Sequence, residues 1–446
     1  MASTFISRTF SGTYNSGTIS MWLKRARLGS QYIFYNESSS DSNDYGLIQF
    51  DSSDRIEFMT VTNGTHTQKL ITNRVFRDTS SFYHFVFSSD TDNSTATNRL
   101  RIYVNGEEET SFATDAVGSQ GDTNYLFQTS ATNKHRLFAS SGGSACFDGL
   151  ATHIHIVPNS QLAPTVFGET DSTSGIWKPK TSPSVTYTAQ GAFLKFEDAN
   201  NLDLDSSGNN LTFTTSGTLT QNIDTPSNVF CVINPLDTYF FENSNFDNGN
   251  LTVSGNNSSY TFCTSTLGVS AGKWYMEAKL SAAAGGGTRI GVVGRTSTAL
   301  SNGLGDRQDE VAHQTNGDLK VNGNTTSSWG STWTVNDIIG IALDLDNNKI
   351  YFSKNGVYQA SGNPSTAANG ITITGADSTS NGVYRFGFGD NNSTGTSTFQ
   401  YNFGSGYFGT TQVSSANADG NGLGAFEYTV PTGYYAVCTK NIKEFG

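Results

Sequence analysis

The chain of 446 residues has little proline, cysteine or charge, and each shortage narrows the class of protein it can be. Charged residues make up only 14% of it, whereas aromatic residues make up 12%. Disordered proteins have the opposite balance, so the composition predicts folded domains with buried cores. Hydrophobic patterns with the period of a helix are almost absent, which leaves strands as the expected elements.

Cysteines and long apolar runs are scarce as well. The four cysteines lie far apart, without the close spacing of metal ligands: Cys146, Cys231, Cys263 and Cys438. They are expected to be small buried hydrophobic residues of a protein made in a reducing compartment. No apolar run reaches the roughly 20 residues of a membrane helix, so no membrane insertion is expected. The first residues show no charged segment followed by an apolar one, so no secretion signal is expected.

Basic residues are outnumbered, with 26 Lys and Arg against 38 Asp and Glu and a formal net charge of −12. Binding to the phosphates of a nucleic acid needs concentrated Lys and Arg. The single basic cluster, Lys24 to Arg27, is too short for such a footprint. Nucleic acid is therefore not expected as a partner.

What the sequence does contain is a succession of alternating segments separated by turn residues. Residues 100–104 run into Asn105-Gly106 and then 107–112, and Asn-Gly accepts the positive φ angles of a two-residue hairpin turn. The second half repeats this pattern, with 350–354 followed by Asn355-Gly356. The expected fold class is all-β, built as two tandem β-sandwiches.

The boundary between the two sandwiches is expected near Pro226. The polar stretch 221–224 precedes it and the apolar run 229–236 follows it. We therefore predict one domain over residues 1–225 and a second over 226–446. The apolar segments at 192–196 and 211–213 are predicted to be late strands that close the first sandwich, not parts of a third domain.

The first half resembles a laminin-G-like, concanavalin-A-type lectin sandwich, a jelly-roll fold. Four stretches carry the resemblance: GTISMWLKRARLGS, SSFYHFVFSSD, NRLRIYVNGEEETSF and FDGLATHIHIVPNSQLAPTVFGE. The segment FLKFEDANNLDLDSSGNNLTF is similar to the opening strand and following loop of that family. Here it comes after the other stretches, so the strand order is expected to be permuted.

The second half resembles a SPRY domain, a β-sandwich of the same broad class. GKWYMEAKL, GDRQDEVAH, VYRFGFGD and the long stretch WTVNDIIGIALDLDNNKIYFSKNGVY carry this resemblance. The tandem of the two domains is similar to virion proteins of marine tailed bacteriophages. That resemblance implies an adhesive structural protein on the virion surface, made in the cytoplasm of the host bacterium. It also implies a homo-oligomer, commonly a trimer, that contacts other virion proteins of the tail or capsid.

A glycan site is predicted in the loops before the core of the SPRY-like half. Sugars present apolar CH faces and rims of hydroxyls, so their sites combine flat aromatic side chains with polar ones. The candidate contacts are Trp329, Trp333, Asp306, Arg307 and Asp309. The alternative for the tryptophans is packing in the core, above all for Trp333, which precedes a strand.

Calcium is the one cofactor that the sequence suggests. Asp203, Asp205 and Asn209 offer oxygen atoms at alternate positions around a glycine turn, as the first half of a calcium loop does. Thr214 stands where the bidentate Glu of an EF-hand would be, so a full EF-type loop is excluded. An ordinary Asp-Ser-Ser-Gly-Asn turn is the alternative.

No catalytic residue is predicted, and we expect a protein that is not an enzyme. Asp344 and Asp346 would share a strand face at about 6.5 Å, a separation compatible with glycoside hydrolysis. The SPRY pattern itself places acids before a turn, which is the simpler interpretation. His153 and His155 could form a zinc pair on one face. No third ligand is identifiable, and two half-buried strand histidines are the simpler interpretation.

The predicted function is attachment to host-surface glycan as a tail fibre or receptor-binding adhesin. Many copies on one particle would offset weak single sites, because tethering raises the effective concentration. The first alternative is a capsid decoration or head-fibre protein. The second is a glycan depolymerase.

Overall fold

The computed structural model describes residues 4–172, 174–237, 245–255, 261–283, 287–295, 303–390 and 396–446. The chain divides into two compact units, one ending at Gln221 and the other beginning at Asn222. Each unit consists mainly of two antiparallel sheets, which confirms the all-β prediction. The boundary predicted between residues 225 and 226 lies just beyond the division between the units.

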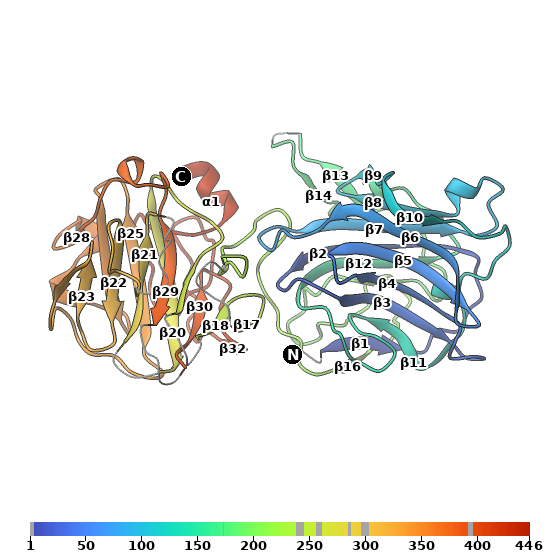
Figure 1. The fold of residues 1–446 in the computed structure, drawn as a ribbon, viewed down its shortest axis with the longest axis horizontal. Helices are drawn as coiled ribbons and strands as arrows, with labels where there is room; N and C mark the ends of the chain where they lie inside the picture. The colour runs from blue at the N-terminus through green and yellow to red at the C-terminus, as the bar shows by residue number, and fades with distance from the viewer. Residues whose placement is uncertain are drawn as a thin grey trace. The chain divides into compact units, whose positions relative to one another are not determined.

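The first unit contains a large sheet of eight described strands (Figure 1). In spatial order these are β10 (Phe112–Ala116), β6 (Thr65–Val75), β5 (Arg55–Thr62), β4 (Tyr45–Phe50), β3 (Gln31–Ser38), β11 (Ser130–Leu137), β1 (Phe5–Arg8) and β16 (Thr214–Ser216).

A six-stranded sheet lies against the large one. Its strands are β15 (Ala192–Leu194), β12 (Gly149–Pro158), β2 (Ser16–Arg25), β7 (Tyr83–Asp90), β8 (Leu100–Val104) and β9 (Glu107–Glu108). Alternate residues of a strand face opposite sides of a sheet. Met21 and Leu23 of β2 therefore join the buried core between the two sheets, while Trp22 lies on the outer side of the six-stranded sheet. The core also contains Phe58 of β5 and Phe87 of β7, whose rings meet edge to face.

The first unit has two late strands at its sheet edges, as predicted, but with other bounds, since β15 covers 192–194 and not 192–196. β15 pairs with β12 at the edge of the six-stranded sheet, and β16 pairs with β1 at the edge of the larger one. The second late strand covers residues 214–216 and not the predicted 211–213. Phe213 is nevertheless buried, so the apolar signal marked a core contact next to the strand.

Both predicted Asn-Gly turns are confirmed. Asn105 and Gly106 have φ angles of 51° and 89°, and the second turn, between β26 and β27, has 50° and 79° at Asn355 and Gly356. These values suit the two-residue turn that matches the twist of a hairpin. The first returning strand is shorter than predicted, because β9 ends at Glu108 and Phe112 begins β10 in the other sheet.

The second unit repeats the two-sheet plan. Its larger sheet contains β17 (Asn245–Asp247), β18 (Thr252–Ser254), β30 (Thr398–Asn402), β20 (Lys273–Ala282), β25 (Ile338–Asp344), β26 (Lys349–Lys354) and β27 (Val357–Tyr358), with β28 (Ile371–Thr372) and β33 (Tyr435–Ala436) beside them. The smaller one contains β19 (Thr261–Thr264), β29 (Arg385–Asp390), β21 (Thr288–Val293), β22 (Glu310–Gln314), β23 (Leu319–Val321) and β24 (Asn324–Thr326).

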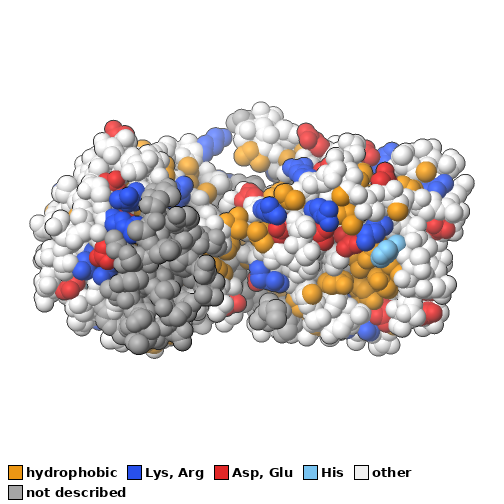
Figure 2. All heavy atoms as spheres, viewed as in Figure 1, with side chains coloured by type: hydrophobic (Ala, Val, Ile, Leu, Met, Phe, Trp, Pro, Cys, Tyr) orange, Lys and Arg blue, Asp and Glu red, His pale blue; other side chains and the backbone are white. Residues whose placement is uncertain are grey.

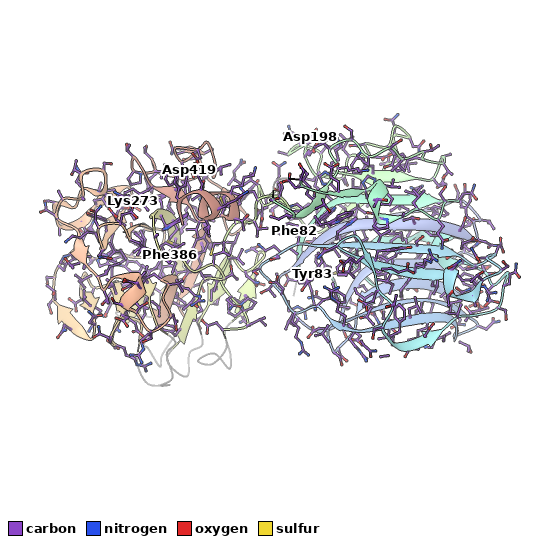
Figure 3. All side chains as sticks on the ribbon, turned by 90° about the horizontal axis from the view of Figure 1, so that it is seen from above. Phe82, Tyr83, Asp198, Lys273, Phe386 and Asp419 are labelled. Carbon is purple, nitrogen blue, oxygen red and sulfur yellow. The ribbon has the colours of Figure 1, made fainter. Side chains whose placement is uncertain are left out.

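The C-terminal segment of the second unit covers the outer side of its larger sheet. Phe426 and Tyr434 of this segment pack with Tyr275 of β20 in a separate buried cluster. Asp419, labelled in Figure 3, accepts hydrogen bonds from Ala436 N and Asn441 Nδ2 at 2.9 and 2.8 Å. The short helix α1 (Thr439–Phe445) ends the chain. This sheet is thus covered on both sides.

Two further observations bear on the sequence predictions. All four cysteines are buried and free, as expected for small core residues. Within the described ranges, no helix has both the length and the apolar character to cross a membrane.

Candidate functional site

The predicted tryptophans of the second unit lie in or against its core. Trp333 is only 2% exposed, and its ring centroid is 5.9 Å from that of buried His313. This corrects the expectation that Trp333 contacts a surface glycan, since its side chain fills space between the sheets. Trp329 is half-buried and meets His313 edge to face at 5.4 Å. Burial lowers the pKa of His313 to about 4, so this histidine is a neutral part of the cluster at pH 7.

The three charged candidates lie in the loop before β22. Asp306 and Asp309 contact other residues of the second unit. Asp306 pairs with Arg289 at 2.8 Å and also accepts a hydrogen bond from Gly303 N. Asp309 is buried, with a positive φ of 62°, and its carboxylate accepts from the side chain of Gln308. Arg307 is half-buried in the same loop. Their role as glycan contacts stays a prediction.

The loop predicted to hold calcium is organised by hydrogen bonds. Asp205 is 6% exposed, and its carboxylate accepts from the backbone N–H groups of Phe193, Ser207 and Leu211. Asp203 accepts from Thr215 Oγ1 at 2.7 Å, and Asn209 donates to the carbonyls of Thr188 and Gly191. These contacts give the loop a structural role, and calcium binding here remains a prediction.

The two predicted carboxylates have separate structural contacts. Asp344 ends β25, is fully buried and pairs with Lys273 Nζ at 3.1 Å. Asp346 lies in the following turn, where it accepts a hydrogen bond from Gly272 N. The sequence expectation that both lie on one strand is corrected, because the strand ends before Asp346.

His153 and His155 lie near each other on the outer side of the six-stranded sheet, at ring distances of 6.0 and 3.9 Å from Phe193. His153 has a φ of 49° and occupies an irregularity of β12. Burial lowers the pKa of both imidazoles. No group of three His, Cys, Asp or Glu side chains within the described part of the chain could hold a metal ion.

A different surface, on the outer side of the eight-stranded sheet, combines aromatic side chains with polar and charged ones. We call it the tyrosine face and define it by Tyr32, Tyr35, Tyr45, Leu47, Met59 and Val61 with the polar residues Gln49, Glu37, Glu57, Lys69 and Lys134. Figure 2 shows hydrophobic side chains gathered over this part of the first unit, with basic and acidic side chains around them. These aromatic and aliphatic residues form a cluster separate from the core.

Strand register arranges the tyrosine face in rows that cross several strands. The central row is Arg136, Tyr35, Leu47, Met59 and Lys69, each paired with the next across β11, β3, β4, β5 and β6. A second row on the same face pairs Glu37 with Tyr45 and Tyr45 with Val61. A third pairs Tyr32 with Gln49 and Gln49 with Glu57. Directly opposed side chains lie about 4.5–5.5 Å apart at Cβ, so each row is continuous.

The residues of the tyrosine face differ in how exposed their side chains are. Tyr35 and Met59 are each 5% exposed and Leu47 2%, so they form a closely packed floor. Tyr32 and Tyr45 are half-buried and lie beside Tyr35, with ring centroids 6.2 and 5.6 Å from it. The two half-buried rings therefore offer the aromatic surface that a ligand can touch.

The polar groups of the tyrosine face are connected to one another. Glu57 pairs with Lys69 at 2.5 Å and accepts a hydrogen bond from Gln49. Glu37 accepts from the Tyr35 hydroxyl at 3.1 Å and lies 3.6 Å from Lys134 Nζ. Burial and the nearby carboxylates raise the pKa of the tyrosine hydroxyls, which stay protonated donors at neutral pH. The surface thus combines ring faces with donors and acceptors of nearly balanced charge.

Sequence reasoning missed this surface for a specific reason. In a regular strand, Tyr32 and Tyr35 would face opposite sides, because their separation is odd. The pairing of β3 with β4 shifts between Tyr32 and Phe34, and this irregularity brings both tyrosines to the same side. The alternation of Tyr45, Leu47 and Gln49 along β4 is the part of the sequence that predicts a shared outer face.

Comparison with known families agrees with this architecture. Residues 5–157 match the family described as the concanavalin A-like lectin/glucanases superfamily, a laminin G model. Residues 273–404 match the SPRY domain. The two resemblances seen in the sequence are therefore confirmed, in the same order along the chain. The first match ends before β15 and β16, although both strands belong to the sheets of the first unit.

Among solved structures, similar chains include the SPRY domain of human HERC1, at 18% identity and a TM-score of 0.30, covering 38% of this chain and 96% of that one. A human SPRY domain has 18% identity and a TM-score of 0.27, covering 35% and 93%. A heptameric SAP-like pentraxin from Limulus polyphemus has 15% identity and a TM-score of 0.27, covering 36% and 71%. No curated protein matches the chain.

Proposed function

We propose that this two-domain protein is a carbohydrate-binding adhesin and that the tyrosine face of its laminin G-like unit binds the glycan. The observation that carries the proposal is the set of cross-strand rows, which places Tyr32 and Tyr45 beside Gln49, Glu37 and Glu57 on the outer side of one sheet.

The chemistry of this surface suits a saccharide. A pyranose ring has an apolar face of CH groups, which stacks on an aromatic ring, and a rim of hydroxyls that donate and accept hydrogen bonds. Tyrosine supplies both a ring face and a hydroxyl. The side chains of Gln49, Glu37 and Lys69 add acceptors and donors within the same rows. The same cross-strand contacts also stabilise the sheet, and this structural role is compatible with binding a glycan.

A flat surface of this kind binds a single sugar weakly, and repetition of the site offsets the weakness. We therefore propose that the protein acts as a homo-oligomer, with a trimer as the favoured form, on the surface of a tailed-bacteriophage virion. There it would contact other virion proteins and attach to host-surface glycan as a tail fibre or related adhesin. The tandem of the two domain types supports this part of the proposal.

The glycan site is tested by the double substitution Tyr32→Ala/Tyr45→Ala in the full chain. We expect at least a tenfold loss of apparent affinity on an array of bacterial surface polysaccharides, because both accessible rings are removed. Tyr407→Ala in the second unit is the matched control, since Tyr407 is also half-buried but belongs to β31 (Tyr407–Phe408) and not to the tyrosine face.

Two further variants keep this test decisive. Gln49→Leu retains the rings and removes a hydrogen-bonding side chain, so a folded protein with weakened binding supports the site. Trp329→Ala examines the loops of the SPRY unit. Unchanged binding by the folded Tyr32→Ala/Tyr45→Ala variant, with loss in Trp329→Ala, would move the site to the second unit and overturn the assignment.

The same preparations separate the proposed adhesin from its rivals. Steady release of reducing sugar ends from a bound polysaccharide would make the protein a depolymerase and contradict the non-enzymatic proposal. Gold-labelled antibody on intact virions distinguishes the two structural roles. Label at the tail supports a tail adhesin, whereas label over the capsid makes it a decoration or head-fibre protein.

A further inference from the structure

The segment from residue 160 to residue 190, described except for residue 173, covers the outer side of the six-stranded sheet, and we call it the clasp. Thr18 Oγ1 of β2 donates to Ser160 O at 2.7 Å and accepts from Leu162 N at 2.9 Å. Phe167 of the clasp is buried against Val86 and Val157 of the sheet. The clasp also contains the hairpin of β13 (Gly168–Thr170) and β14 (Trp177–Pro179), which lies beside β8 and β9 in Figure 1.

One histidine of the sheet contacts the hairpin through both a hydrogen bond and a ring stack. His84 of β7 stacks on Trp22 at a centroid distance of 4.6 Å and on Trp177 of the clasp at 6.0 Å. Trp177 Nε1 donates a hydrogen bond to His84 Nδ1 at 2.9 Å. The Trp177 indole also lies against Gly106 and Gly168, and a Cβ at Gly168 would come within 2.5 Å of it.

This hydrogen bond fixes the protonation state of His84. An indole N–H can only donate, so His84 Nδ1 must be the unprotonated acceptor. The proton of the neutral ring is then on Nε2, which lies 2.9 Å from Ser20 Oγ and donates to it. A second proton on Nδ1 would point at the indole N–H and break the contact. Burial and the nearby His153 lower the pKa of His84 to about 3.

A second histidine holds the other end of the clasp. His155 Nδ1 lies 2.6 Å from the hydroxyl of Tyr187, and the two rings are nearly parallel. The imidazole also stacks on Phe193, at a centroid distance of 3.9 Å. Burial lowers the pKa of His155 as well, with smaller contributions from the neighbouring histidines and Lys195.

The charged surroundings also favour the neutral rings. The titratable groups that interact with the two histidines or with their immediate partners are His153 on β12, Lys195 and Glu197 after β15, Tyr187 of the clasp and Asp205 of the following loop. Glu197 raises the pKa of His153, and Asp205 raises the pKa of the Tyr187 hydroxyl. Lys178 of the hairpin is paired with Asp171, 2.7 Å away.

We propose that residues 160–190 form an acid-releasable clasp, closed while His84 and His155 are neutral and released from the sheet when they are protonated, with the sandwich beneath remaining folded. The core between the two sheets does not include the clasp, so the sandwich can stay folded when the clasp is released. Met21, Phe85 and Ile156 of the same sheet pack between the two sheets and not against the clasp.

The sign of the pH dependence follows from proton binding. The released clasp exposes both imidazoles, whose pKa values then return to about 6.5. Below that pH the released state binds more protons than the closed state, so acid favours release. The closing constant falls about tenfold per pH unit for one histidine and about a hundredfold for both, until the pKa of the closed state is reached.

The test is amide hydrogen exchange of the full chain between pH 7.5 and 4, expressed as protection factors. We expect the amides of β13 and β14 to lose protection at a higher pH than those of β2 and β7. Simultaneous loss of protection in the clasp and these two strands would overturn the proposal, because release would then be part of global unfolding.

Two variants identify the histidine responsible. His84→Gln keeps an acceptor for Trp177 and a donor for Ser20 but cannot titrate, so the pH of release should fall and its steepness should decrease. His66→Gln is the matched control, because His66 is exposed at the start of β6. If His84→Gln folds and releases its clasp at the wild-type pH with the wild-type steepness, His84 is not the trigger and the proposal fails.

Discussion

At the scale of single residues, Glu277 is a buried ionisable group whose charge affects stability. It lies on β20 with no exposed surface and accepts hydrogen bonds from Glu427 N and Tyr428 N at 2.8 Å each. The hydroxyl of Tyr275 donates to it at 3.0 Å. Burial raises the pKa of Glu277 to about 7 despite these donors. One carboxyl group therefore attaches the C-terminal segment and changes its charge near neutral pH.

This raised pKa predicts that the second unit becomes less stable as pH rises from about 4.5 to 7. In that window the folded protein binds more protons than the unfolded chain, so stability decreases with pH, by up to about 3 kcal/mol. Glu277→Gln should flatten this dependence. The measurement is urea unfolding at several pH values, followed by amide exchange of β20 and β25. Glu169→Gln, at a partly exposed site in the first unit, is the control, and equal slopes in wild type and Glu277→Gln would contradict the prediction.

At the scale of elements, the loop around Asp205 positions an edge strand. Asp205 accepts from Phe193 N of β15 and also from Ser207 N and Leu211 N of its own loop. The carboxylate therefore attaches the turn to the strand that closes the six-stranded sheet. Without it, buried N–H groups would lose their acceptor, which costs more than the average hydrogen bond contributes.

We predict that Asp205→Ala destabilises the first unit by about 2–4 kcal/mol. Asp198→Ala is the matched control, because the side chain of the exposed Asp198 accepts a short-range hydrogen bond from Asn200 N. Urea unfolding measures both variants. Addition of calcium to the same experiment tests whether the loop binds the ion. A rise in wild-type stability that Asp205→Ala lacks would establish the calcium loop. Equal losses of stability in Asp205→Ala and Asp198→Ala would contradict the structural role of Asp205.

Elements also show what the sequence could and could not predict. Both hairpin turns were predictable because Asn-Gly encodes its φ angles locally. The strand irregularities at Tyr32 and at His153 were not, because an extra residue is placed by packing against neighbouring strands. The tyrosine face depends on the first of these irregularities. The burial of Trp333, by contrast, agrees with the alternative that its position just before a strand offered.

At the scale of the whole molecule, each unit has a core of its own. The first is built around residues such as Phe58 and Phe87, and the second around residues such as Trp274 and Phe399. The laminin G-like match ends at residue 157, yet the first sandwich is completed only by β15 and β16. The folding unit is therefore longer than the family match.

We predict that residues 1–221 and 222–446 fold when produced separately, because each contains two complete sheets and the core between them. Calorimetry and amide exchange of each fragment, compared with the full chain, measure this. A fragment ending at residue 190 is the control: it lacks β15 and β16, so it should melt at a lower temperature or fail to fold. Failure of fragment 1–221, with the full chain intact, would show that the units depend on each other.

The pairing of β1 with β16 has a consequence for how the protein is made. Phe5 lies opposite Ser216, so β1 receives this neighbour only after about 210 further residues have been translated. Contacts between residues so distant in sequence slow folding. Until then the edge of β1 is open, and unpaired edges invite association between chains. Chains synthesised at high concentration must therefore be kept apart until β16 has been translated and paired.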